Sequence, residues 1–291
     1  MKKKLKTSKY LIEYSFLVVF FSIINLLPIK FTSKLGSLIF RSLGIFSKKH
    51  SLAIQNCKLV FPDLDDKKIK NIVIKSWENL GKTIFELLRL NNIIKKYKID
   101  IVGEKNIKKI IENKKQAIFI GIHQSNWEIC VPLLDNLDIK VGAIYRHINN
   151  NLIDKLVLNK RMSSIKNSES FYTPKGRKSA KDIIDGIKKN NSVFLLVDQK
   201  DSAGEKILFF NIPVNTQTGF IKIARKYKIP IIPMQNQRIA NDKFSVTFFE
   251  PIEDFNKKIS DKDIMLSIHK IIEDWIRSNP SQWFWQHNRF N

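Results

Sequence analysis

The sequence has few of the residues that build cross-linked or metal-bound folds. Among 291 residues there are two cysteines, Cys57 and Cys130, which lie far apart and form no Cys-x-x-Cys pair. Neither a disulfide framework nor a zinc site can be built from them, which favours a reducing compartment. No His-Glu-x-x-His motif or other cluster of metal-binding residues is evident. We therefore expect neither a metal nor a cofactor.

The motifs of several other function classes are missing as well. No Gly-x-Ser-x-Gly elbow is present, which argues against a serine hydrolase of that type. No helix-turn-helix, zinc-finger or aromatic RNA-binding motif supports nucleic-acid binding. There is also no internal repeat and no low-complexity linker, while 43% of the residues are hydrophobic. The chain can therefore bury one sizeable core in a main domain.

Acidic residues are scarce. Against 51 Lys and Arg there are 27 Asp and Glu, which gives a formal net charge of +24. Such an excess attracts polyanions, either nucleic acid or anionic lipid head groups. The chain is also rich in Lys, Ile and Asn, so compositional drift on a solvated surface explains part of the lysine excess equally well. The charge alone does not select a partner.

The amino-terminal segment combines a basic start with an uncharged stretch. Five lysines stand among the first nine residues, and residues 14–29 carry no charge. No small-residue cleavage site follows, unlike in a signal peptide. The uncharged run is slightly shorter than the roughly 20 residues that span a bilayer as a helix. A single span, a helix in the membrane interface, or a hairpin with apolar residues 35–46 fit equally well. We expect residues 1–48 to be a membrane anchor with a basic flank.

The rest of the chain alternates between two periodicities. Residues 51–92 have helical spacing with a break at residues 61–63. Short apolar runs typical of buried strands lie at residues 117–120, 141–145, 193–197 and 229–234. Helical stretches at residues 152–163, 179–189 and 218–228 alternate with these runs, and a strand at residues 244–250 and a helix at residues 261–278 follow. This alternation predicts an α/β fold, with a central, mostly parallel sheet flanked by helices.

Active sites in such sheets lie at the carboxyl ends of the strands. His123 follows the first predicted strand and Asp198 ends the third. Glu128 stands five residues after His123, and on a regular helix the two side chains would diverge by about 140°. If residues 124–126 form a turn, Glu128 can hold one ring nitrogen while the other takes a proton from a substrate hydroxyl. The alternative is a structural histidine beside a surface glutamate.

Four further residues are candidates for substrate binding. Arg146 follows the second strand, where it could clamp a phosphate group or be ordinary solvated charge. Asp198 could hold Arg146, bind a sugar hydroxyl or simply cap its strand. Gln199 shares this rim of the sheet, and Asn126 lies in the predicted turn.

These motifs, in this order, resemble the bacterial lipid A biosynthesis late acyltransferases, also called the lauroyl/myristoyl acyltransferase family. The resemblance covers essentially the whole chain and rests on residues 121–128, 145–146, 196–199, 209–219 and 282–290. It implies a glycerolipid-acyltransferase-like domain at residues 49–291 behind the anchor. Asn211 departs from the pattern, because the family often has Gly after the paired phenylalanines.

The resemblance also implies a reaction. A fatty acyl chain would pass from acyl carrier protein to a hydroxyl of a lipid A precursor, in lipopolysaccharide biosynthesis. His123 would be the base, Glu128 would orient and charge-balance it, and no acyl-enzyme would form. Arg146 and Asp198 match family positions tied to substrate binding or site architecture. Both partners are anionic, nucleic acid is not among them, and the place of action would be the cytoplasmic face of the bacterial inner membrane.

Two other functions stay open on the sequence. The same chemistry could act on another glycolipid or on a lysophospholipid, for example a phosphatidylinositol mannoside, and coenzyme A could replace the carrier protein as donor. A non-catalytic basic protein that binds membranes or nucleic acid is the third possibility, and it predicts that His123→Ala leaves function intact.

Overall fold

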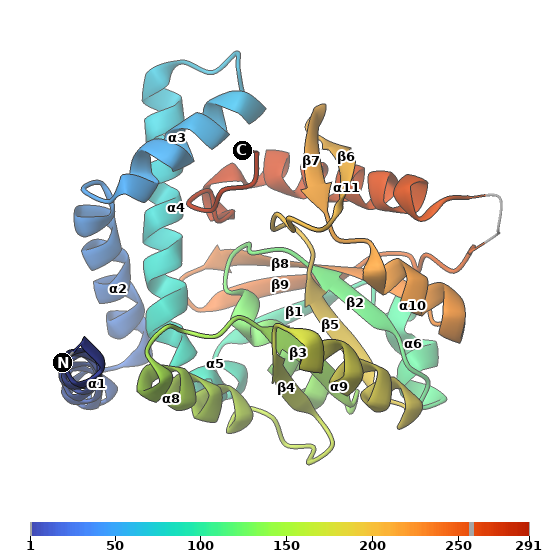
Figure 1. Ribbon diagram of the computed structural model, residues 1–291, viewed down its shortest axis with the longest axis horizontal. Helices are drawn as coiled ribbons and strands as arrows, with labels where there is room; N and C mark the ends of the chain where they lie inside the picture. The colour runs from blue at the N-terminus through green and yellow to red at the C-terminus, as the bar shows by residue number, and fades with distance from the viewer. Residues whose placement is uncertain (1, 256–258, 291) are drawn as a thin grey trace.

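The fold is built around a seven-stranded sheet with the strand order β1–β9–β8–β2–β5–β3–β4 (Figure 1). The computed structural model describes residues 2–255 and 259–290, apart from the side chains of residues 2–6 and 177. The strands are β1 (Lys98–Val102), β2 (Ile118–Gly121), β3 (Val141–Tyr145), β4 (Phe171–Pro174), β5 (Ser192–Leu196), β8 (Ile231–Ala240) and β9 (Lys243–Phe248). Within this sheet, as far as the structure describes it, only the pair β8–β9 is antiparallel. The predicted α/β fold with a mostly parallel sheet is confirmed.

Helices cover both faces of this sheet, which explains the uninterrupted apolar runs. Successive side chains of a strand point to opposite faces. Ile118 and Ile120 of β2 accordingly join one buried cluster, while Phe119 between them joins another. The covering helices are α6 (Lys105–Glu112), α7 (Cys130–Asn136), α8 (Asn151–Met162), α9 (Arg177–Lys188), α10 (Gly219–Tyr227) and α11 (Asp261–Ser278). Short 3-10 helices η1 (Trp127–Ile129) and η2 (Pro280–Gln282) complete this part.

A separate antiparallel hairpin, which the sequence pattern did not predict, lies between β5 and α10. Its strands are β6 (Glu205–Phe209) and β7 (Ile212–Thr216). The turn residues Phe210 and Asn211 have φ of 52° and 60°. Two consecutive left-handed residues are what a tight two-residue hairpin needs, and Asn tolerates that conformation better than most residues other than Gly. Asn211 therefore preserves the turn despite its departure from the family's Gly.

The amino-terminal helices stand beside the sheet on one flank (Figure 1). They are α1 (Lys2–Asn25), α2 (Ile29–Gly44), α3 (Lys48–Val60), α4 (Asp66–Leu87) and α5 (Leu90–Lys96). The expected helical region with a break after Val60 is confirmed, and the Asp65 carboxylate caps α4 by accepting the backbone N–H of Lys68 at 2.8 Å. Helices α2 and α4 cross closely at Gly36 and Gly81. A Cβ atom on Gly81 would lie 2.1 Å from the carbonyl oxygen of Gly36, so the crossing requires glycine.

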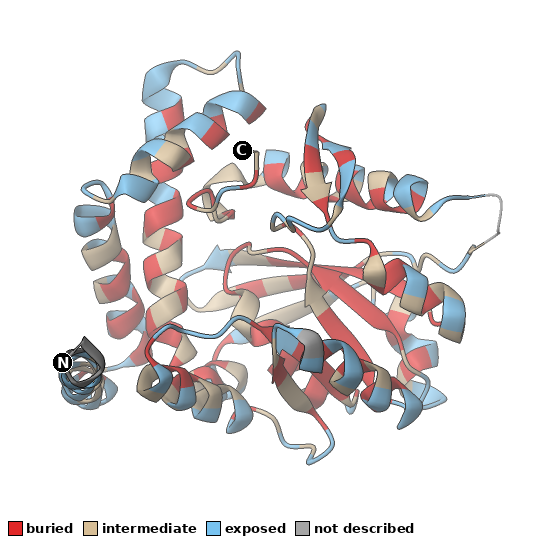
Figure 2. Cartoon of the chain, in the orientation of Figure 1, coloured by how far each residue is buried: buried red, intermediate tan, exposed pale blue. Residues whose placement is uncertain are grey.

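Helix α2 turns its small residues inward and its large apolar residues outward. Its buried face includes Thr32, Ser33, Gly36 and Ser37, whereas Phe31, Leu38 and Leu43 are at least half exposed. Helix α1 likewise exposes an apolar stripe of Ile12, Phe16, Val19 and Ile23, and Figure 2 shows it almost wholly unburied. By length and composition, residues 7–25 are enough to cross a membrane. The division of the chain into an anchor at residues 1–48 and an acyltransferase domain at residues 49–291 stays a prediction.

Candidate functional site

The site is built at the carboxyl ends of two neighbouring parallel strands. His123 lies two residues after β2, and Asp198 lies two residues after β5. The ring Nδ1 of His123 is 2.7 Å from Oδ1 of Asp198, and the backbone N–H of His123 donates to Oδ2 at 3.0 Å. The two residues that the sequence placed on one rim of the sheet are thus in direct contact.

The Asp198 carboxylate is held ionised inside the protein. Its side chain is 1% exposed, and the indole N–H of Trp283 donates to Oδ2 at 2.8 Å. Burial alone would raise the pKa of Asp198, but the adjacent His123 and His287 and the Trp283 hydrogen bond outweigh it, so its pKa lies below the ordinary value. Burial lowers the pKa of His287 to about 4, so this histidine is neutral near pH 7.

The opposite ring nitrogen of His123 is the one available for chemistry. A neutral imidazole that donates Nδ1–H to a carboxylate has its lone pair on Nε2. The side-chain amide of Gln199 lies 3.1 Å from Nε2 and is oriented to donate to it. The rings of Trp127 and Phe284 lie 5.1 and 6.2 Å from the imidazole centroid. The His123 side chain is 17% exposed, so the imidazole is not completely shielded from solvent.

Glu128 does not occupy the position expected for it. Its carboxylate instead pairs with both Nε and Nη2 of Arg161, at 2.8 and 2.7 Å, and no hydrogen bond joins it to His123 among the described residues. Ser125 has φ of 56°, so the chain does turn after His123. The 3-10 helix that follows carries Glu128 toward α8. The carboxylate that fixes the imidazole is that of Asp198, which follows a different strand, β5.

The Glu128–Arg161 pair is itself largely buried. The side chains are 9% and 15% exposed, and the guanidinium carbon of Arg161 lies 5.7 Å from the ring centroid of Tyr145 and 6.0 Å from that of Tyr172. Burial opposes the charge on Arg161, but Glu128 more than compensates and raises the pKa of Arg161 above its ordinary value. This ion pair fixes α8 against the turn that carries the histidine.

Asn126, expected to bind substrate, is fully buried and supports the turn instead. Its side-chain oxygen accepts the backbone N–H of Glu128 at 3.2 Å, and its amide donates to Oε2 of Glu86 at 2.8 Å. Glu86 also receives two hydrogen bonds from Arg238, at 2.9 and 2.6 Å, and one from Ser33 at 2.6 Å. A buried ion pair therefore connects α2, α4, β8 and the histidine turn.

Arg146 lies on the exposed surface just beyond β3. It has no hydrogen bond or ion pair with the described residues, and Asp198 does not hold it. Its guanidinium is therefore free to meet an anion from outside. The next residue, His147, is paired through Nδ1 with the Asp154 carboxylate at 2.6 Å.

Several contributors to the site were not singled out from spacing. Arg161 belongs to a predicted helix and gave no local signal. Trp283 and His287 belong to the terminal motif of residues 282–290, where Arg289 donates to the backbone oxygen of Asn215 at 2.9 Å. That motif, with its aromatic, His and Arg residues, was the sequence feature that could have indicated Trp283 and His287 as parts of the site.

A histidine–carboxylate pair at the strand ends of an α/β fold is an arrangement that can serve general-base catalysis on an oxygen nucleophile. Cys130, near the pair in sequence, is buried, and burial raises the pKa of its thiol, so it is not an activated nucleophile. In the described residues, no group of three His, Cys, Asp or Glu side chains could hold a metal.

Residues 1–291 match the family of bacterial lipid A biosynthesis acyltransferases, and the chain belongs to this family. The lipid A biosynthesis lauroyltransferase of Escherichia coli is 23% identical over 257 residues, covering 86% of this chain and 81% of that protein. The E. coli lipid A biosynthesis palmitoleoyltransferase is 24% identical over 257 residues, covering 84% and 79%. The protein is an acyltransferase of lipid A biosynthesis.

A similar solved structure is the 1-acyl-sn-glycerophosphate acyltransferase PlsC from Thermotoga maritima. It covers 85% of this chain and 97% of that chain, with 15% identity and a TM-score of 0.41.

Proposed function

We propose that the protein transfers a fatty acyl chain from an acyl carrier protein thioester to a hydroxyl of a lipid A precursor, with Nε2 of His123 as the base. The observation that carries this proposal is the 2.7 Å contact between Nδ1 of His123 and the buried Asp198 carboxylate. This contact fixes the tautomer in which Nε2 has the lone pair, and it stabilises the imidazolium that forms when the base takes a proton.

The reaction needs no covalent intermediate with the protein. His123 takes the proton from the acceptor hydroxyl as the oxygen attacks the thioester carbonyl carbon. The carbon–sulfur bond then breaks, and the leaving thiolate takes the proton from His123. An ester and a free carrier thiol result, and the base returns to its starting state. Gln199, whose amide lies 3.1 Å from Nε2, gives way to the hydroxyl when the acceptor binds.

Glu128 acts in this scheme through Arg161 rather than on the imidazole. Their bidentate pair holds the turn that carries His123, and loss of either partner would leave a buried charge. Arg146, exposed and unpaired at the same rim, is the side chain best placed to bind an anionic group of the acceptor or donor.

We further propose that α1 and α2 attach the enzyme to a membrane. Phe16 on α1, and Phe31 and Leu38 on α2, are exposed large apolar side chains, and an outward apolar face of this kind marks an interaction surface. Lysines stand on both sides of the uncharged residues 14–29, among them Lys9 before this run and Lys34 after it, which suits anionic lipid head groups. The acceptor and product are lipids, and the inner membrane with a cytoplasmic catalytic domain is the location that fits an acidic carrier protein as donor.

The proposal is tested by a transfer assay with the full chain in nanodiscs. Acyl carrier protein with a radiolabelled acyl chain is the donor, and the acceptors are a Kdo-bearing lipid A precursor, a lysophospholipid and a phosphatidylinositol mannoside. We expect labelled product with the lipid A precursor alone. If labelled product forms with one of the other lipids instead, the proposed acceptor is wrong. If acyl coenzyme A supports transfer as fast as acyl carrier protein does, the proposed donor is wrong.

The base is tested in the same assay by His123→Ala. We expect transfer to fall to the background of the donor and acceptor without enzyme. The matched control is His50→Ala, a histidine on α3 that pairs with Trp77 and lies outside the site. If His123→Ala transfers as fast as His50→Ala, the general-base mechanism is wrong.

A further inference from the structure

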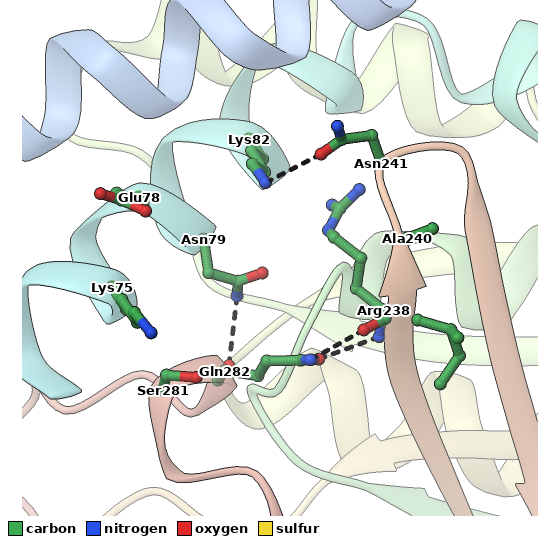
Figure 3. Close-up of a pocket in the computed structure, with 10 residues that line it drawn as sticks. Lys75, Glu78, Asn79, Lys82, Arg238, Ala240, Asn241, Ser281 and Gln282 are labelled. Atoms are coloured by element: carbon green, nitrogen blue, oxygen red, sulfur yellow. Dashed lines mark hydrogen bonds between the residues drawn. The ribbon is translucent and has the colours of Figure 1, made fainter.

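A cavity lies beside the histidine site and has no part in the mechanism. It is bounded by α4, the end of β8 with the turn that follows, and η2, and it is open to solvent with a volume of about 400 Å³ (Figure 3). Gln282 lines it, and Phe284, two residues further on, packs against the His123 ring and donates its backbone N–H to the His123 carbonyl at 2.9 Å. One short segment therefore separates the cavity from the site.

Two lysines of α4 line the cavity without a carboxylate partner. Lys75 and Lys82 are seven residues apart and so lie on the same face of the helix. Among the described residues neither forms an ion pair, and the contact of Lys82 is with the side-chain oxygen of Asn241 at 3.4 Å (Figure 3). An ammonium group offers three donors, so both lysines retain donors for a ligand.

The acidic residues nearby are already neutralised. Glu78, which also lines the cavity, pairs with Arg41 at 3.0 Å. Arg238 lines the opposite wall, and its charge is balanced by the buried Glu86 at 2.6 Å. The two lysines thus leave the cavity with an uncompensated positive charge.

The environment of Lys82 is costly for a charge without an anion. Its side chain is only partly exposed, and burial together with the neighbouring Arg238 lowers the pKa of Lys82 below its ordinary value, although Glu86 and Glu78 oppose the shift. A solvated surface lysine has neither feature. A bound anion would offset both effects.

We propose that this cavity binds a phosphate monoester, held by the ammonium groups of Lys75 and Lys82. A dianion matches two ammonium groups in charge, and its oxygens accept the hydrogen bonds that they can donate. The volume exceeds that of a phosphate group and falls within the range of about 300–1,000 Å³ typical of small-ligand sites. The Ser281 hydroxyl and the Asn241 amide on the wall suit a polar organic portion of the ligand.

Calorimetry on the detergent-solubilised full chain tests this, with glycerol 3-phosphate as probe and glycerol as the neutral control. We expect saturable binding of glycerol 3-phosphate alone. Lys75→Gln and Lys82→Gln should each weaken it roughly tenfold, the effect of losing one charge-assisted hydrogen bond. Lys70→Gln is the matched control, because Lys70 is exposed on α4 and does not line the cavity. Equal weakening by Lys70→Gln would overturn the proposal, and so would the absence of binding by both glycerol 3-phosphate and a lipid phosphate monoester.

The lipid probe distinguishes a head group from a free ligand. Nanodiscs that contain phosphatidic acid are compared with nanodiscs of phosphatidylcholine, and protection of the Lys82 amine from acetylation is measured by mass spectrometry on the unaltered chain. Protection by phosphatidic acid supports a lipid head group, and protection by glycerol 3-phosphate alone supports a soluble ester. If Lys82 is acetylated equally fast with both probes and without them, the cavity is not a phosphate site. This readout does not depend on acyl transfer or on the folding of a variant.

Discussion

Asp198 binds His123 twice, through the ring Nδ1 at 2.7 Å and through the backbone N–H at 3.0 Å. The two contacts fix the orientation of the imidazole and the position of the chain that carries it. The indole of Trp283 donates to the same carboxylate oxygen as the backbone N–H. The carboxylate is therefore positioned by the carboxy-terminal motif as well as by its own strand.

Replacing Trp283 by Phe removes the indole hydrogen bond and keeps most of the packing. We expect kcat to fall by roughly tenfold, because Asp198 loses a donor that keeps it ionised and aligned. The KM for the acceptor should change little, since the indole faces Asp198 and not the solvent. Steady-state transfer rates measure both constants. An unchanged kcat in a variant that keeps its unfolding temperature would show that the hydrogen bond has no catalytic effect.

Arg161→Met should destabilise the protein more than the double variant Arg161→Met with Glu128→Gln. The single change leaves the mostly buried Glu128 charge without its partner, at a cost of about 3–5 kcal/mol in the free energy of unfolding. The second change removes that charge. Urea unfolding of both single variants and the double variant gives the coupling energy. Additive effects would contradict a tight Glu128–Arg161 pair.

Glu86→Gln should be severely destabilising for the same reason. Glu86 is fully buried and Arg238 nearly so, and the change leaves the guanidinium uncompensated. We expect a loss of about 3–5 kcal/mol in the free energy of unfolding. Glu78→Gln on the same helix is the matched control, because its pair with the exposed Arg41 is worth about 1 kcal/mol or less. If Glu86→Gln and Glu78→Gln lower the free energy of unfolding in urea by the same amount, the buried Glu86–Arg238 pair has no special role in stability.

Stability should decrease as the pH falls from about 6.5 toward 4. Burial lowers the pKa of both His269 and His287 to about 4, below the ordinary value near 6.5. Between pH 6.5 and 4 the unfolded chain binds protons that the folded chain excludes. The free energy of unfolding therefore decreases as the pH is lowered. Each histidine accounts for a loss of up to about 3 kcal/mol in the free energy of unfolding over this pH range. Urea unfolding at several pH values should show a shallower slope for His287→Gln, and an unchanged slope would contradict the assignment.

The sequence predicted the central strands because most of their residues are buried, but it missed the edge strands β1 and β4, whose residues are mostly half-exposed or exposed. Continuous apolar runs such as residues 141–145 coincide with β3, since no alternation with polar residues obscures them. The β6–β7 hairpin was missed because its exposed positions, such as Glu205 and Lys206, break the apolar pattern. Its turn also has Asn211 in place of the Gly that would have indicated it.

The candidate site was predicted in part. The order of strands brings His123 and Asp198 together although they are 75 positions apart, and the rule that sites lie at strand ends was enough to place both on one rim. Spacing could not decide which carboxylate faces the imidazole. Glu128 is nearer in sequence, but its direction depends on a left-handed Ser125 and on Arg161 of a distant helix.

The most direct test of the general-base mechanism is the effect of Asp198→Asn on kcat for acyl transfer to the lipid A precursor. The asparagine keeps the shape of the side chain but cannot stabilise an imidazolium on His123. The mechanism predicts a fall in kcat of roughly 10²–10⁴-fold, with the KM for the acceptor almost unchanged. A kcat within about threefold of the unaltered enzyme would show that Asp198 does not hold the catalytic base.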